Sequence, residues 1–280
     1  MFAYSTNAYT RTDLADAIRR IAGLGYEGIE ILLDTPHLFP PTSSDQDVDD
    51  VRQALDAAGL RVSNTNGNTA RGYFDDPPDE GVFEPSLNHP DPAVRQRRID
   101  CALRGLEIAA ALGSPAMSTS SGKCHPTTPP ERAFDLLVES LKPIMERAEA
   151  LGVNVGIEAE PALLVETTVE VMEVAERVGS DRLGLNFDLG HAAVMGEDLV
   201  ARAAAVAHRT WNVHVEDIRA GKHWHHVPGD GDLDLAAALT ALRAAGYSGA
   251  FTVELYTYVE DPDLAGRRAL EHLLGLGLDR

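Results

Sequence analysis

Eight short β-rich runs alternate with helix-like segments along the chain, and this alternation restricts the fold more than any other feature. The runs cover residues 2–6, 28–33, 61–66, 116–121, 154–160, 183–189, 211–217 and 250–256. Between them lie segments such as TDLADAIRRIAGLGY (12–26), in which apolar residues recur three or four positions apart, as on one face of a helix. A strand followed by a helix, eight times over, predicts an α/β fold of the (β/α)8 TIM barrel type.

The main rival architecture is a doubly wound open sheet, which usually carries a glycine-rich turn after its first strand. The segment that follows the first run here, STNAYTRTD, contains no glycine, so the barrel is favoured. No linker divides the chain, and its length of 280 residues is close to the ~250 of a typical single barrel. We therefore expect one barrel domain over residues 1–280.

Two connections are longer than the others. Residues 67–92 follow the third expected strand, and residues 218–232 follow the seventh. Both leave the carboxyl ends of strands, the face at which barrels of this type carry their chemistry. We expect these connections to contact a substrate.

Acidic side chains outnumber basic ones, 44 to 24, which gives a formal net charge of −20. Nucleic acids and anionic membranes are bound through clustered Lys and Arg, so neither is expected as a partner. No stretch approaches the ~18 consecutive apolar residues of a membrane-spanning helix, and no secretory signal is visible. The two cysteines, Cys101 and Cys124, lack metal-ligand spacing. The composition favours a cytoplasmic protein that acts on neutral or cationic small molecules.

Each of the last four expected strands ends near one ionisable side chain: Glu158, Asp188, His214 and Glu254. In a closed barrel these strand ends are neighbours around one half of the mouth. Three carboxylates at short range would repel and raise one another's pKa unless a divalent cation compensated them. Three carboxylate oxygens and one imidazole nitrogen form a suitable ligand set, so the pattern predicts one metal ion. Oxygen-rich ligation with one imidazole favours Mn2+, with Mg2+, Co2+ and Zn2+ as alternatives.

Several segments resemble the sugar phosphate isomerase/epimerase superfamily, the xylose isomerase-like TIM barrels, over nearly the whole chain. They are GYEGIEIL (25–32), IEAEP (157–161), LNFDLGH (185–191), VHVED (213–217), PGDGDLDL (228–235) and GYSGAFTVEL (246–255). PHLFPP (36–41) and VELYTYVEDPDLAGRRALE (253–271) most resemble the ketose 3-epimerase and fructosamine epimerase branch. The resemblance implies that Glu158, Asp188, His214 and Glu254 are metal ligands and that the two glutamates are also the catalytic acid/base pair. It further implies a homo-oligomer, a dimer or a tetramer.

The resemblance also implies substrate contacts. His191, three residues after Asp188, corresponds to one of them, and Glu166 corresponds to another after a two-residue gap. The family has an arginine six residues after the ligand histidine. That position is Ala220 in this chain, so the adjacent Arg219 is taken in its place.

Three further histidines are expected near the substrate. His225 and His226 belong to the segment KHWHHVPGD after the seventh expected strand, and His37 follows the second. A second metal bound by the histidines of that segment is a less favoured alternative. Glu30, in the second run, is expected to form a structural hydrogen bond inside the barrel rather than to assist catalysis.

These residues predict a metal-dependent isomerase or epimerase that acts on an α-hydroxy ketone, a ketose or a related polyol ketone. One glutamate would remove a proton next to the carbonyl and the other would return it, through a metal-stabilised cis-enediolate. The first alternative is dehydration or isomerisation of an inosose or another cyclitol ketone at the same metal site. A non-catalytic carbohydrate-binding barrel is less favoured because it would not need two glutamates. Abasic-site endonucleases share the fold, but their zinc cluster needs histidines that the third and fourth strand ends lack.

Overall fold

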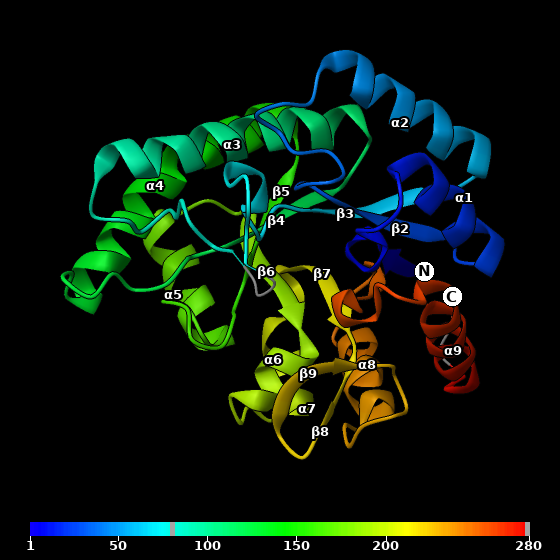
Figure 1. Ribbon diagram of the computed structural model, residues 1–280. Coiled ribbons are helices and arrows are strands. Elements are labelled where there is room, and N and C mark those ends of the chain that lie inside the picture. Colours follow the sequence, from blue (N-terminus) through cyan, green and yellow to red (C-terminus); the bar gives the residue numbers. More distant parts are fainter. Residues whose placement is uncertain (79–81, 278–280) are drawn as a thin grey trace.

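A closed barrel of eight parallel strands forms the centre of the computed structural model, which describes residues 1–78 and 82–277 (Figure 1). Around the barrel the strands follow the order β1-β10-β7-β6-β5-β4-β3-β2, and β1 pairs with both β2 and β10. The strands are β1 (Phe2–Ser5), β2 (Gly28–Leu32), β3 (Arg61–Asn66), β4 (Ala116–Ser120), β5 (Asn154–Glu158), β6 (Leu183–Asp188), β7 (Thr210–Val215) and β10 (Phe251–Val253). The predicted (β/α)8 TIM barrel is therefore confirmed.

Helices connect the strands and surround the barrel (Figure 1). They are α1 (Leu14–Leu24), α2 (Asp45–Ala58), α3 (Pro92–Ala111), α4 (Pro130–Leu151), α5 (Thr168–Val178), α6 (Leu189–Val194), α7 (Leu199–Val206), α8 (Leu235–Ala244) and α9 (Pro262–Gly275). Local sequence fixes several helix ends. In α2, Ser44 and Asp47 form a capping box, and Gly59 ends the helix in the left-handed conformation. None of the helices in the described part of the chain is long and apolar enough to cross a membrane.

The interior of the barrel is polar, whereas the apolar side chains of the strands pack against the helices. Thr252 of β10 donates a hydrogen bond to Ser63 of β3 (3.1 Å), and Asn212 of β7 donates to Glu30 of β2 (3.3 Å). Neither pair lies on neighbouring strands, so both contacts cross the interior. Strand residues such as Phe187 belong instead to the hydrophobic core shared with the helices. The strands therefore bury both faces, as parallel strands do.

The connection after the seventh barrel strand differs from the expectation. The run 211–217 was expected to be one strand followed by an irregular loop. Strand β7 ends at Val215, and β8 (Asp217–Arg219) pairs with β9 (Lys222–His226) in an antiparallel hairpin outside the barrel. Ala220 and Gly221 form its turn with φ angles of 52° and 62°, which suits a two-residue hairpin turn. The sequence hid this turn because alanine rarely adopts a positive φ.

The other long connection, residues 67–92, was expected to contact a substrate. It contains a short 3-10 helix, Arg71–Tyr73, and residues 79–81 lie outside the described part of the chain. The eighth barrel strand is also shorter than the expected run 250–256, because β10 ends at Val253 and Glu254 follows it directly.

Close packing between β6 and the segment before β7 yields a stability prediction. A Cβ atom at Gly184 would collide with the backbone oxygen of Arg209, whereas a Cβ at Gly23 in α1 would meet nothing within 4 Å. Gly184→Ala should lower the free energy of unfolding by about 1–3 kcal/mol. The control Gly23→Ala should raise it by about 0.5–1 kcal/mol through its effect on helix propensity. Urea unfolding of both variants measures this, and equal midpoints would contradict the prediction.

Candidate metal centre and active site

The four predicted metal ligands meet at one point of the barrel mouth. Oxygen or nitrogen atoms of Glu158, Asp188, His214 and Glu254 lie within 4.8 Å of one another, and all four residues are buried. The side chains come from the ends of β5 and β6, from β7 and from the residue after β10. His214 Nδ1 lies 3.1 Å from Glu158 Oε2, 3.7 Å from Asp188 Oδ2 and 3.6 Å from Glu254 Oε2. One imidazole nitrogen therefore faces three carboxylates.

Glu30 determines which nitrogen of His214 faces that cluster. Its Oε2 atom lies 2.8 Å from His214 Nε2, and both side chains are fully buried. Burial opposes the charge of Glu30, but the adjacent His214 lowers the pKa of this carboxyl below its usual value. A carboxylate that holds the distal nitrogen of a ligand histidine orients the ring and leaves the other nitrogen for a metal. The structural hydrogen bond expected for Glu30 is present.

Asparagine amides hold the two glutamates. Asn68 Nδ2 donates to Glu158 Oε2 at 2.8 Å, and Asn186 Nδ2 donates to the same oxygen. Glu254 Oε1 accepts from Asn7 (2.8 Å) and Asn66 (3.2 Å). Each carboxylate therefore has one oxygen fixed by two amides.

Asp188 is anchored by one oxygen only. Its Oδ1 atom accepts a 2.7 Å hydrogen bond from the backbone N–H of His191, whereas Oδ2 is buried and has no hydrogen-bond partner among the described residues. Burial opposes ionisation, yet the nearby histidines keep the pKa of Asp188 well below its usual range. A buried, charged oxygen without a donor fits a position at which a cation binds.

The charges of the cluster also favour a cation. Burial, together with the charges of Glu158 and Asp188, raises the pKa of Glu254 well above its usual value. Among the described residues, the ion pairs recorded for these three carboxylates are with histidines, not with Lys or Arg. Three carboxylates and an imidazole without a basic partner match the donor set of a divalent metal. The residues present therefore fit one.

Two of the predicted substrate residues lie beside this cluster. His191 Nε2 and His225 Nε2 are 3.3 Å apart, and each ring places its Nδ1 atom 3.1 Å from a backbone oxygen, that of Ala159 or that of Glu254. The ring of His223 packs against His191, with ring centroids 4.7 Å apart. One ring nitrogen from each of these three histidines lies within 4.8 Å of the other two, a spacing at which they could hold a metal ion. The predicted roles of His191 and His225 in substrate binding stay predictions.

The other predicted substrate residues lie outside these groups. Glu166 accepts a hydrogen bond from the backbone of Ala162 (2.8 Å), and exposed Arg219 donates to the backbone oxygen of Asp230. His37 contacts Thr6 and the backbone of Thr12, and His226 is half-buried at the end of β9. No metal-binding group among the described residues includes any of the four. Their roles as substrate contacts also stay predictions.

Sequence analysis missed two carboxylates at the site. Glu160 lies 3.7 Å from His191 Nε2, and Glu216 shares a group of close ligand atoms with Asp188 and Glu254. Each follows a predicted ligand by two positions, and residues i and i+2 of a strand point to the same side. That spacing was the signal that could have found them. Burial, opposed in part by His191, raises the pKa of Glu160 to about 7.

A model of the xylose isomerase-like TIM barrel family matches residues 18–275. The chain belongs to this family. Fructoselysine 3-epimerase of Escherichia coli O157:H7 is 26% identical over 281 residues, which cover 97% of this chain and 96% of the relative. Inosose dehydratase of Geobacillus thermodenitrificans is 30% identical over 152 residues, 48% of this chain and 50% of the relative.

Solved structures share the fold of this chain. The IOLI protein with a bound zinc atom matches this chain with a TM-score of 0.80 at 20% identity. The match covers 98% of this chain and 97% of the IOLI chain. D-psicose 3-epimerase in the presence of D-fructose has a TM-score of 0.80 at 17% identity, with 98% of each chain covered. The family predicted from the sequence is confirmed, and the relatives named as epimerases agree with the expectation of an isomerase.

The pKa of Glu160 predicts how stability depends on pH in this barrel without metal. The carboxyl has a pKa of about 7 when folded, against an ordinary value of 4.5. Between these values the folded chain holds a proton that the unfolded chain has released, so this group makes stability fall as pH rises. Glu160→Gln should remove a slope of at most about 1.4 kcal/mol per pH unit. Chemical unfolding of the wild type and of Glu160→Gln from pH 4.5 to 7.5 measures this slope. A difference in unfolding free energy between the two proteins that stays constant over this range would contradict the prediction.

Proposed function

We propose that this barrel is a metal-dependent isomerase that epimerises an α-hydroxy ketone, a ketose or a related polyol ketone. The observation that carries the proposal is the convergence of Glu158, Asp188, His214 and Glu254, with the buried Asp188 Oδ2 left without a donor among the residues that the structure describes. The four side chains would bind one divalent cation, for which we favour Mn2+. Membership of the family and similarity to an epimerase over nearly the whole chain support it.

The arrangement suits proton transfer at the carbon next to a ketone. A bound cation would polarise the ketone oxygen and the neighbouring hydroxyl, which acidifies the C–H bond between them. One of the two glutamates would then accept that proton, and the other would supply a proton to the opposite face to invert the centre. Glu158 Oε1 carries no amide hydrogen bond among the described contacts, because both amides bind Oε2. Fixed carboxylates are suited to this exchange because their positions need not change during it.

The substrate would be a small unphosphorylated molecule. His191 and His225 each place Nδ1 against a backbone oxygen, and their Nε2 atoms, which face each other at 3.3 Å, are the polar ring atoms that a substrate hydroxyl would contact. Glu166, Arg219, His226 and His37 are proposed as further contacts on the carbohydrate family resemblance alone. The relative named fructoselysine 3-epimerase favours an amine-bearing ketose within this class.

A second candidate reaction is the dehydration or isomerisation of an inosose. Relatives named inosose dehydratase and inosose isomerase are 30% identical to this chain, over 48% and 42% of its length. Both reactions would use the same cation and a glutamate base. A carbohydrate-binding protein without catalysis would not need two buried glutamates held by amides. We further propose a single domain over residues 1–280, since no linker divides the chain, and a cytoplasmic location, which the composition favours. A homo-oligomer, a dimer or a tetramer, is proposed on the family resemblance.

Metal content tests the ligand set. Protein purified without chelator should contain about one divalent ion per chain, most of it Mn2+ when the medium supplies that metal. His214→Ala should lose it, because the imidazole nitrogen that faces Glu158, Asp188 and Glu254 together is removed. His208→Ala, at an exposed histidine before β7, is the control and should keep wild-type content. Elemental analysis decides, and equal metal in His214→Ala and wild type would overturn the assignment.

The reaction itself is tested by hydrogen exchange in D2O with Mn2+ and a panel of free ketoses, fructosamines and inososes. Epimerisation should place solvent deuterium on the carbon next to the ketone in both substrate and product. Glu158→Gln and Glu254→Gln should each lower kcat by about 10²–10⁴-fold, since each removes an acid/base group. Glu176→Gln, at an exposed position of α5, is the control. Loss of water to a diketone would instead support the dehydratase.

A further inference from the structure

Arg98 of α3 is a buried cation outside the group of four predicted metal ligands. The residue is only 3% exposed, and no ion pair is recorded for it among the described residues. Its guanidinium instead donates to three successive backbone oxygens, those of Gly67, Asn68 (3.0 Å) and Thr69 (2.9 Å). Burying a charge against neutral carbonyls is costly, so these bonds call for an explanation beyond packing.

The three oxygens belong to the segment that leaves β3 towards the predicted metal ligands. Asn68 is fixed there at three points. Its backbone oxygen also accepts from Ser120 Oγ (2.8 Å), its N–H donates to Asn66 Oδ1 (3.1 Å), and its side-chain amide donates to Glu158 Oε2 (2.8 Å). Only one residue therefore separates Arg98 from a predicted ligand and base.

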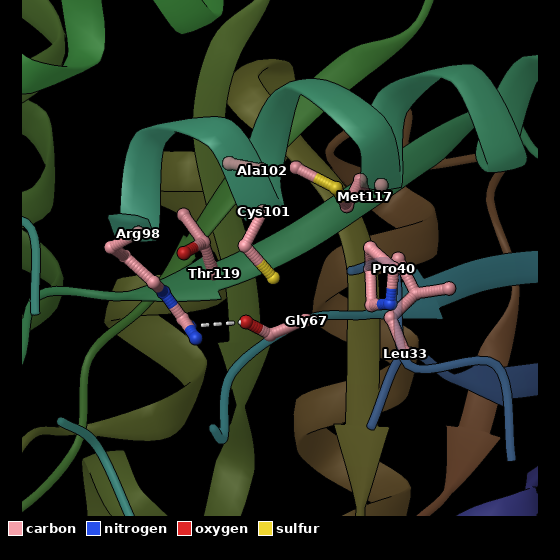
Figure 2. Close-up of a pocket in the computed structure, with 9 residues that line it drawn as sticks. Leu33, Pro40, Gly67, Arg98, Cys101, Ala102, Met117 and Thr119 are labelled. Carbon is pink, nitrogen blue, oxygen red and sulfur yellow. Dashed lines mark hydrogen bonds between the residues drawn. The ribbon is translucent and has the colours of Figure 1, made fainter. Parts of the chain in front are cut away.

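Packing alone does not hold this segment. Figure 2 shows Arg98 and Gly67 on the wall of a small cavity under α3, which Cys101, Met117 and Thr119 also line. The cavity volume is about 10 Å³, the size at which a single water molecule fits. The backbone at Gly67 borders this void on the side of α3, so close packing does not cover it there, and its carbonyl oxygen is held by the Arg98 guanidinium. The rigid fork of a guanidinium can bind several carbonyl oxygens at once, which a lysine ammonium does less well.

The continuation of the segment is fixed separately. Asp34, which is fully buried, accepts hydrogen bonds from Thr69 Oγ1 (2.6 Å) and from the backbone N–H groups of Arg71 (2.7 Å) and Gly72 (2.8 Å). Asp34 therefore holds the N–H groups and hydroxyl of residues 69–72, while Arg98 holds the carbonyl groups of residues 67–69. The contact that reaches Glu158 lies in the part held by Arg98.

We propose that Arg98 is a positioning residue for Glu158. Its guanidinium fixes the backbone of residues 67–69 and, through the Asn68 amide, holds the Glu158 carboxylate in place for metal binding. This inference rests on the proposed function, in which Glu158 is a metal ligand. Residues that hydrogen-bond a metal ligand typically contribute about 10- to 100-fold to metal affinity.

A double-mutant cycle on Mn2+ affinity tests the proposal. Arg98→Met and Asn68→Ala should each raise the Mn2+ dissociation constant about tenfold, and the double variant should raise it by no more than about the same factor. The single effects coincide because both substitutions loosen one contact to Glu158. Arg98→Lys, which keeps the charge, should give an intermediate affinity. It also serves as the second variant if Arg98→Met does not fold.

Arg95→Met is the matched control. Arg95 lies on the same helix and also donates to backbone oxygens, those of His89 (2.7 Å) and Pro90 (3.1 Å), but no hydrogen bond or ion pair joins these two residues to Glu158 among the described contacts. The Mn2+ affinity of Arg95→Met should equal that of the wild type, even if the unfolding midpoint of this variant falls. If Arg98 had a purely structural role, Arg98→Met would lower the unfolding midpoint, and its effect on Mn2+ affinity would not be coupled to that of Asn68→Ala.

The possible outcomes separate this inference from the proposed function. Wild-type affinity in Arg98→Met and Arg98→Lys, or single effects that multiply to about 100-fold in the double variant, would overturn the role of Arg98 alone. Wild-type protein that binds no Mn2+ would overturn the metal site, and this inference with it. A coupled, roughly tenfold loss that spares Arg95→Met supports both.

Discussion

Buried negative charge at the barrel mouth is the constraint on which the rest of this structure depends. Five carboxylates, those of Glu30, Glu158, Asp188, Glu216 and Glu254, are at most 5% exposed and converge near His214. Burial and mutual repulsion penalise this arrangement unless each charge finds a donor or a cation. Barrel closure makes the problem unavoidable, because it brings β2, β5, β6, β7 and β10 around one axis. A divalent cation would remove most of the repulsion in one step.

Asparagine side-chain amides in the barrel interior donate hydrogen bonds to these carboxylates. Asn64, Asn66 and Asn212 donate to Glu30, while other asparagines hold Glu158 and Glu254. Barrel interiors are more often filled by branched apolar side chains. Here the apolar residues of the strands face the helices, so hydrophobic stabilisation comes from the outer layer and the interior is left for polar contacts. A neutral amide donor satisfies a carboxylate without neutralising it, which keeps the cluster able to attract a cation.

Sequence alone predicted the parts of the site that stand at the carboxyl ends of the strands. The four predicted ligands each stand at the end of a different parallel strand, and parallel strand ends meet on one face of a barrel. Arg98 could not be found in this way. It shares the segment VRQRRID with Arg95 and Arg97, and nothing in that sequence tells which arginine points inward. The hairpin β8–β9 escaped detection because an alanine occupies a turn position at which glycine or asparagine is the usual signal.

The segment FDLGH shows why one short sequence can satisfy the fold and the site together. Asp188 is the N-cap of α6, so one of its oxygens accepts a hydrogen bond from the N–H of His191 while the other faces His214 Nδ1 at 3.7 Å. Gly190 is required because a Cβ at that position would collide with the carboxyl of Glu216, which accepts the Gly190 N–H. His191, one helical step further, is thereby held beside His225. The helix start and the predicted ligand position are one structural unit, so a substitution that removes the Asp188 carboxylate would lose a helix cap as well as a predicted ligand.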